Sequence, residues 1–188
     1  YPRDPKRDAR LCQAEKTDLL WTPGVEDMYP PGFTTTVDVG SDLTQTLCGA
    51  ARPGHFRGVA TVVTKMLILV RPQRLYLGQK DYQQSLVIRR LVEDLALGAE
   101  VVVLPTVRES DGLAKSSRNA YLDEESRRAA PAIYQSLKLA ESMLQVGERN
   151  AKDVLDAVRK RLRAEPRIDV EYVALKQADT LEELRVVG

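Results

Sequence analysis

The sequence predicts an α/β fold built on a parallel sheet, followed by a smaller and more helical unit. Segments 58–70, 74–78, 81–98 and 99–105 alternate between helical and strand patterns, which is typical of a parallel sheet. The last of these, AEVVVLP, is a continuous apolar run of the kind that is buried on both faces of such a sheet. Beyond residue 121 the pattern changes to amphipathic helices.

The elements before this region are shorter. We predict a helix over 5–15 and a short strand over 19–22. FTTTVDVG (33–40) alternates and is rich in β-branched residues, which predicts a second strand. SDLTQTLCGA (41–50) is expected to form a short helix that ends at Gly49.

The two central helices show the clearest periodicity. In the helix over 58–70, which Pro72 stops, the expected buried face consists of Val59, Val62, Val63, Met66, Leu67 and Val70. In the helix over 81–98, which Gly98 is expected to end, it consists of Tyr82, Leu86, Val87, Leu91, Val92 and Leu95. In the final third, helices over 123–147 and 148–166 break at Gly147, and an alternating strand follows over 168–179.

Composition excludes several function classes. The 188 residues are 43% hydrophobic and 29% charged with a net charge of +1, so bulk charge does not favour nucleic-acid binding and any anion site must be local. No apolar run approaches 18 residues, and the first ten residues lack the features of a signal peptide, so we expect no membrane partner. Cys12 and Cys48 are expected to be free thiols in a reducing cytoplasm. The single histidine, His55, excludes two-histidine zinc sites within this chain, and no GxSxG elbow accompanies it.

LGQKDYQQ (77–84) follows the strand over 74–78 and permits two interpretations. Asp81 and Gln84 have the spacing of a capping box at the start of a helix. The same geometry suits a ligand, because Gly78 permits close approach, the helix start offers free N–H groups and Lys80 adds positive charge. Gln84 could then hydrogen-bond a neutral or carboxylate substrate. The spacing alone does not decide between them.

PTVRESDGLAKSSRNAYL (105–122) follows the other predicted strand and contains what we call the cationic segment: Lys115, Ser116, Ser117 and Arg118. A lysine, two hydroxyls and an arginine can surround a polyphosphate with donors. The alternative is a solvated connection whose serines and Asn119 cap the next helix. Because two loops suited to anions follow two parallel strands, we favour phosphoryl or nucleotidyl chemistry at this edge of the sheet.

ARPGHFRGVATVV (51–63) clusters Arg52, His55 and Arg57 just before Gly58 opens a helix. His55 could act as an acid, a base or a phosphate ligand. A lone histidine at the start of a helix is more often structural, and its role stays open.

Four stretches occur in order along the chain: YPRDPKRD, RPGHFRGVATVVTKM, LGQKDYQQ and PTVRESDGLAKSSRNAYL. Together they resemble the pantothenate synthetase family, also called pantoate–β-alanine ligases, of the nucleotidyltransferase superfamily. The resemblance runs to about residue 175 and is strongest over 52–122. It implies a Rossmann-like nucleotide-binding domain, with part of its sheet, and a small α+β C-terminal domain. The change of pattern near 117–123 predicts that these domains cover 1–118 and 119–188.

The resemblance also implies a reaction. ATP activates pantoate to a pantoyl adenylate with release of pyrophosphate, and the amine of β-alanine then attacks to give pantothenate and AMP. Mg²⁺ accompanies ATP, no cofactor is permanently bound and no protein metal site is expected. The family is typically a cytoplasmic homodimer of the coenzyme A pathway.

The resemblance assigns roles to individual residues. Gln84 corresponds to a pantoate-binding glutamine. ATP contacts fall on Gly78, Gln79, Lys80, Asp81, Val107, Lys115, Ser116, Ser117 and Arg118, with the backbone of Val107 meeting the adenine. The cationic segment is the counterpart of the KMSKS loop, although position 115 is more often apolar in the family. The catalytic roles, neutralising charge on the α-phosphate and the pyrophosphate, fall to Lys80, Ser116, Ser117 and Arg118.

The chain departs from the family by absence. The family's PTMGALHxGH segment, its NPxQF strand and its closing C-terminal strands are missing, so we expect a truncated chain whose 188 residues alone are nearly inactive. One alternative is a non-catalytic fragment that retains part of the ATP site. Another is a related nucleotidyltransferase with a different acceptor, against which Gln84 and the RPGHF motif argue.

Overall fold

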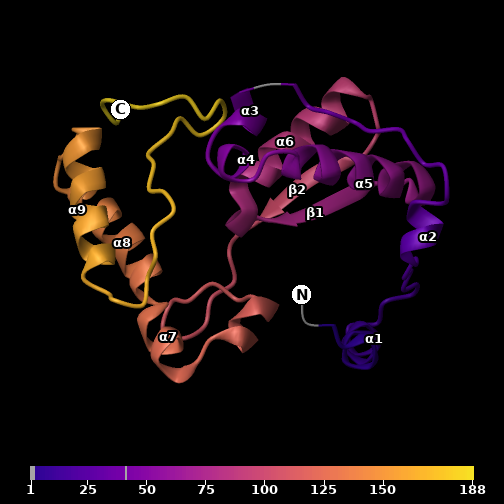
Figure 1. Cartoon of the computed structure of the whole chain (residues 1–188), viewed down its shortest axis with the longest axis horizontal. Coiled ribbons are helices and arrows are strands. Elements are labelled where there is room, and N and C mark those ends of the chain that lie inside the picture. Colours follow the sequence, from indigo (N-terminus) through magenta and orange to yellow (C-terminus); the bar gives the residue numbers. More distant parts are fainter. Residues whose placement is uncertain (1–2, 41) are drawn as a thin grey trace.

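A computed structural model describes residues 3–40 and 42–188, and it confirms the α/β class with a parallel sheet. Strands β1 (Arg74–Gly78) and β2 (Glu100–Leu104) pair in parallel, from Arg74 opposite Glu100 to Gly78 opposite Leu104 (Figure 1). Helix α5 (His55–Val70) precedes β1, and α6 (Tyr82–Asp94) connects the two strands. The carboxyl ends of both strands therefore lie at one edge of the sheet.

Apolar side chains of α5 and α6 hold the sheet. Leu67 of α5 packs with Ile88 and Val92 of α6 against the half-buried Leu75 and Val101 of the strands. A second cluster is built around α6 and includes segments far apart in the sequence: Val39, Leu43, Phe56, Ala60, Leu86, Val87, Leu91 and Leu181. The first cluster packs the two helices against the strands, and the second joins α5 and α6 to segments outside the sheet.

The predicted burial of 99–105 on both faces is wrong. Val101, Val102 and Val103 are only half-buried, and Leu104 is 48% exposed. On β1, Leu75 and Leu77 are half-buried whereas Tyr76 between them is 57% exposed. The reason is that, within the described residues, helices cover one face of this two-stranded sheet more fully than the other.

The three strands predicted outside the central region are also wrong. Segments 19–22, 33–40 and 168–179 form no strand in the described part of the chain. Alternation favours extended backbone, but a strand needs a ladder partner. In segment 33–40 the N–H of Val37 instead donates to Thr61 Oγ1 of α5 at 2.9 Å. Segment 168–179 makes one isolated bridge, between Lys176 and Glu183.

Helix boundaries differ from the predictions at several places. Helix α1 (Pro5–Ala14) is as predicted within one residue, and a short helix α2 (Val25–Met28) follows. The predicted helix over 41–50 is two helices, α3 (Asp42–Gln45) and α4 (Cys48–Ala51), and its first residue lies outside the described ranges. Gly49 lies inside α4 rather than at its end.

The buried faces of the central helices also differ in part. Helix α5 buries Phe56, Ala60, Thr61, Thr64 and Leu67, so its buried stripe is rotated away from Met66 and Val70, which are exposed. Helix α6 ends at Asp94, before the expected Gly98, although Gly98 does have a positive φ of 72°. Its predicted face is buried at Leu86, Val87, Leu91 and Val92 but exposed at Tyr82 and Leu95.

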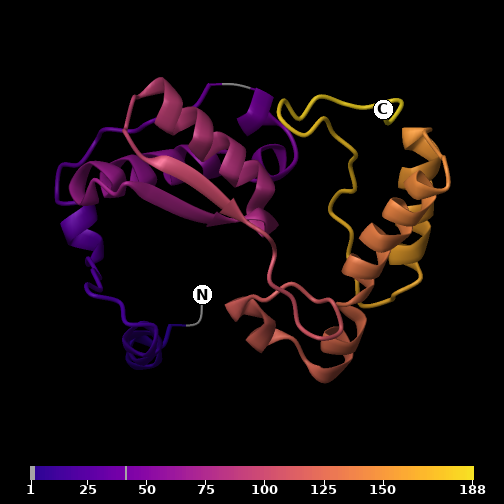
Figure 2. The ribbon, with the colours of Figure 1, turned by 180° about the vertical axis from the view of Figure 1, so that it is seen from behind.

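The final third contains three helices, α7 (Glu124–Ala129), α8 (Ala132–Gln145) and α9 (Ala151–Arg163). The break at Gly147 is confirmed, and Pro131, which lacks an N–H, accompanies a further break between α7 and α8. Figures 1 and 2 show the segment after α9, in yellow, returning from these helices toward the sheet. The division into domains 1–118 and 119–188 stays a prediction.

Two further findings concern the helices and the cysteines. None of the described helices has the length and apolar character needed to cross a membrane. Cys12 and Cys48 are both free thiols, as predicted. Cys48 Sγ lies 2.8 Å from the hydroxyl of Tyr172, and burial together with this hydrogen bond raises the pKa of Tyr172 to about 12.

Candidate functional site

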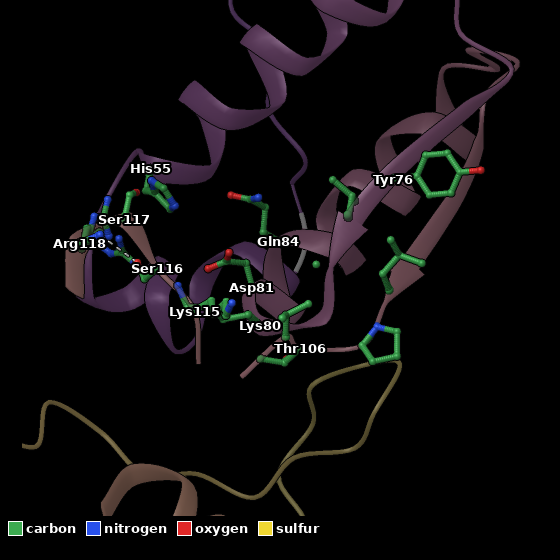
Figure 3. A pocket seen from close by; sticks show the side chains of 16 residues that line it. His55, Tyr76, Lys80, Asp81, Gln84, Thr106, Lys115, Ser116, Ser117 and Arg118 are labelled. Carbon is green, nitrogen blue, oxygen red and sulfur yellow. Dashed lines mark hydrogen bonds between the residues drawn. The ribbon is translucent and has the colours of Figure 1, made fainter. Parts of the chain in front are cut away.

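A cavity of about 660 Å³ lies at the carboxyl ends of β1 and β2 (Figure 3). The end of β1, the turn after it and the start of α6 contribute Gly78, Lys80, Asp81 and Gln84 to its wall. The connection after β2 contributes Val107 and the whole cationic segment. Gln79 is the one predicted residue outside this wall, and it lines a neighbouring cavity beside α8. The structure thus brings together the two loops that the sequence singled out.

The turn between β1 and α6 leaves both a carboxylate and a stretch of backbone open to the cavity. A single 3₁₀ turn, η1 (Gln79–Asp81), joins β1 to α6. Asp81 is the N-cap residue of α6, but its side chain accepts no capping hydrogen bond, so the capping-box interpretation is wrong. Its carboxylate is exposed at the cavity instead. A Cβ added at Gly78 would meet no atom within 4 Å, which leaves open space beside the backbone there.

The two consecutive glutamines of α6 have different environments. Gln83 is buried, and its amide nitrogen donates to the carbonyls of Leu43 and Thr46, both at 2.8 Å. Its amide oxygen accepts from the N–H of Cys48 at 3.0 Å. Gln84 is half-buried and lies in the cavity with Asp81 (Figure 3). Gln83 therefore holds α3 and α4 in place, and Gln84 is available to a ligand.

In the cationic segment one side chain stabilises the local backbone and the others are exposed at the cavity. Ser116 Oγ accepts from the N–H of Arg118 at 3.2 Å and caps the 3₁₀ helix η2 (Ser117–Tyr121), so the capping alternative is correct at this serine. Asn119 does not cap, because its side-chain nitrogen donates to the carbonyl of Ala114 at 3.1 Å. Lys115, Ser117 and Arg118 are exposed and line the cavity.

Charge in the cavity is strongly unbalanced. Among the described residues of its wall, the cationic side chains are Arg52, Lys80, Lys115 and Arg118, and the one carboxylate is Asp81. None of these four cations forms an ion pair with a described carboxylate. Concentrated positive charge at the carboxyl ends of the strands favours an anionic ligand such as a polyphosphate.

His55 is the first residue of α5 and also lines the cavity. Burial and the neighbouring charge of Arg52 lower the pKa of His55, and Asp81 opposes this effect. The ring contacts Phe56 with 5.0 Å between the centroids. The lowered pKa favours the uncharged ring, which has a nitrogen available to accept a proton.

Sequence reasoning did not assign Arg52, Tyr76 or Thr106 to the site, although all three line it. The position of Arg52 in the RPGHF motif was a usable signal, because His55 of the same motif faces the cavity. Tyr76 and Thr106 carry no such signal, since their positions depend on where β1 and β2 end. Within the described residues, no group of three or more His, Cys, Asp or Glu side chains could hold a metal ion.

Comparisons with known proteins agree with this geometry. Residues 1–187 match the family model of pantoate-beta-alanine ligase. The pantothenate synthetase of Moorella thermoacetica is 50% identical over 188 residues, which are all of this chain and 66% of that protein. That of Roseiflexus sp. (strain RS-1) is 52% identical over 187 residues, and 67% of its length is covered. The chain spans about two thirds of the length of these curated relatives.

A solved structure gives the same result. The crystal structure of pantothenate synthetase from Thermus thermophilus superposes with a TM-score of 0.97 at 49% identity, covering all of this chain and 68% of that one. A pantoate-beta-alanine ligase from Francisella tularensis, complexed with beta-gamma ATP and beta-alanine, has a TM-score of 0.72 at 32% identity, covering 86% of this chain and 59% of its own. With motifs, fold and site in agreement, this chain belongs to the pantoate–β-alanine ligase family.

Proposed function

We propose that the protein condenses pantoate with β-alanine in two steps. The carboxylate of pantoate first attacks the α-phosphorus of ATP, forming pantoyl adenylate and releasing pyrophosphate. The amine of β-alanine then attacks the acyl carbon, forming pantothenate and releasing AMP. The observation that carries the proposal is the convergence of the GQKD loop and the cationic segment on one cavity, where four cations face one carboxylate.

The phosphate chemistry would fall to Lys80, Ser116, Ser117 and Arg118. Adenylation builds negative charge on the α-phosphate and on the departing pyrophosphate, and fixed cations and hydroxyl donors stabilise such charge. Lys80 approaches from the first loop and the other three from the second. Ser116 would act from a fixed position because its Oγ already accepts a hydrogen bond from the backbone of Arg118. Lys115 adds a further positive charge at the same wall.

The adenine would meet the backbone of Val107. The carbonyl of Val107 already accepts from the N–H of Lys115 at 2.9 Å. Its own N–H donates to no described group, so it is the atom that could donate to an adenine nitrogen. The open space beside Gly78 would admit the ribose. Gln79 would contribute to ATP binding from the edge of the site, because it lines the neighbouring cavity rather than this one.

Pantoate would be held by the amide of Gln84, and Mg²⁺ would arrive with ATP. Asp81 is the one described carboxylate of the cavity, and proteins commonly hold Mg²⁺ through one or two carboxylates together with substrate phosphates. When bound there, Mg²⁺ would neutralise phosphate charge. The Francisella ligase complex supports ATP and β-alanine as substrates. Family membership supports a cytoplasmic homodimer.

The test uses the complete product of the encoding gene. We expect exchange of labelled pyrophosphate into ATP that requires pantoate and proceeds without β-alanine, and pantothenate detected by mass spectrometry once β-alanine is added. Exchange with another acid but not with pantoate would indicate a related nucleotidyltransferase. No exchange with any acid would indicate a non-catalytic protein. The 188-residue chain assayed alone should show little or no turnover, and near-normal turnover would contradict that expectation.

A further inference from the structure

The connection between β2 and the cationic segment forms a hairpin. Arg108 and Ala114 pair as an isolated antiparallel bridge. The N–H of Glu109 donates to the carbonyl of Leu113 at 2.8 Å. At the base, the N–H of Lys115 donates to the carbonyl of Val107 at 2.9 Å. This base bond joins two residues of the cavity wall and ties the two arms of the hairpin to each other.

The tip of the hairpin is bound to α7 and α8. Asp111 Oδ2 lies 2.5 Å from the guanidinium of Arg127 in α7, and Asp111 Oδ1 accepts from the N–H of Leu113 at 3.1 Å. The hydrogen bond from Arg127 holds the pKa of Asp111 below its usual value. Arg108 lies over the ring of Tyr134 in α8, 3.9 Å from its centroid, and also donates to the carbonyl of Gly112 at 3.1 Å.

Gly112 permits this arrangement. It is buried with a φ of 92°, and a Cβ there would lie 2.2 Å from Cδ1 of Tyr134. A position that combines a left-handed backbone with close contact to an aromatic ring requires glycine. We call Arg108, Asp111, Gly112, Arg127 and Tyr134 the hairpin anchor. None of the five lines the main cavity.

We propose that the hairpin anchor positions the cationic segment against Lys80 on the opposite wall, so that its residues govern ATP binding without touching ATP. This role rests on the proposed function for its ligand. The segment follows directly after the far arm of the hairpin, and its first residue, Lys115, is held by the base bond to Val107. Displacement of the tip would therefore displace Val107 and Lys115 together. The five anchor residues are positioning residues.

The competing explanation is that the anchor only stabilises the fold. The side chains of Asp111 and Arg127 are each 38% exposed, and ion pairs of this exposure contribute little to stability. Loss of this ion pair should consequently leave the free energy of unfolding almost unchanged. If the anchor positions the segment, its loss should instead appear in the mobility of residues 113–119 and in ATP binding.

The deciding experiment compares Arg127→Gln with Arg128→Gln in the complete gene product. Arg128 is the matched control, because it lies next to Arg127, has the same charge and pairs with Glu124 inside α7. In Arg127→Gln we expect faster amide hydrogen exchange over residues 113–119. We also expect a KM for ATP raised about three- to fivefold, with the KM for pantoate unchanged, as suits the loss of one partly exposed ion pair. Arg127→Lys should recover part of both effects, and Arg128→Gln should show neither.

A second variant tests the contact on α8. Tyr134→Phe keeps the ring under Arg108 and should exchange as the wild type does, whereas Tyr134→Leu removes the stacked face and should exchange faster over the same residues. Unchanged exchange in both Arg127→Gln and Tyr134→Leu would overturn the proposal. So would equal rises in both KM values. Amide hydrogen exchange needs no catalytic turnover. A protein without ligase activity would therefore refute the proposed function, and the exchange rates would still show whether the anchor positions the segment.

Discussion

The two neighbouring glutamines of α6 give a sharp test of which side chain holds the fold and which faces the cavity. Gln83→Leu and Gln84→Leu make the same chemical change at adjacent positions. Gln83 is 7% exposed and makes three hydrogen bonds to the chain around α3 and α4. Gln84 is half-buried and lines the cavity. We expect the first variant to lose stability and the second to keep it.

The magnitude follows from the bonds that Gln83→Leu removes. A typical intramolecular hydrogen bond contributes about 1 kcal/mol net, and a buried group left without its partner costs about 1–3 kcal/mol. Removing three bonds leaves the N–H of Cys48 and two carbonyls to find other partners, so we expect a loss of about 3 kcal/mol. For a chain of this length that corresponds to a fall in Tm of roughly 6–12 °C. Gln84→Leu should change stability by less than about 0.5 kcal/mol.

Thermal unfolding followed by circular dichroism measures both variants in one experiment. In the complete gene product, Gln84→Leu should also raise the KM for pantoate, while its Tm matches the wild type. A Gln83→Leu variant within about 2 °C of the wild-type Tm would refute the assignment, using the same conversion. Equal losses of stability in both variants would refute it too.

Three further predictions concern single positions. Thr64→Val should keep or raise the Tm, because Thr64 Oγ1 is buried and has no hydrogen-bond partner in the described chain; a clear fall would show that the hydroxyl is satisfied. Gly49→Ala should lower the Tm strongly, because its Cβ would lie 1.9 Å from the carbonyl oxygen of Thr44. The control Gly58→Ala, in open space on α5, should raise the Tm slightly. Equal effects on the Tm would contradict the close packing at Gly49. His55, the one histidine of the sequence, should titrate below pH 6.5 by NMR, because burial and the charge of Arg52 lower its pKa. Arg52→Gln should move the titration midpoint upward. A wild-type midpoint above 6.5 would contradict the burial argument.

The sequence predicts the central elements well because their signals are local and redundant. Helical periodicity, the apolar run of β2 and the glycine that ends β1 all favour the same arrangement. The site follows from one topological rule, since the carboxyl ends of neighbouring parallel strands meet at one edge of the sheet. As the rule predicts, Lys80, which follows β1, and Arg118, which lies beyond the hairpin that follows β2, line the same cavity.

The failures arise where the partner of a segment determines its structure. Alternation in 33–40 is real, but Val37 finds its hydrogen-bond partner in Thr61 of a helix rather than in another strand. The spacing of Asp81 and Gln84 left capping and ligand binding open, and the structure shows a carboxylate at Asp81 that makes no capping hydrogen bond and lines the cavity. No sequence pattern indicates the contact between Arg108 and Tyr134, because it joins the hairpin to a helix that lies well beyond it along the chain.

The account depends most on the claim that the cavity stabilises the charge of an adenylation reaction. Its most direct test is pantoate-dependent pyrophosphate exchange by Lys80→Ala and Arg118→Ala in the complete gene product, with Arg89→Ala, an exposed position of α6 outside the cavity, as the control. We predict exchange at least tenfold slower in the first two variants, equivalent to about 1.4 kcal/mol of barrier, with Tm unchanged and Arg89→Ala at the wild-type rate. Wild-type exchange in either cavity variant, or a loss that occurs only through unfolding, would contradict the claim.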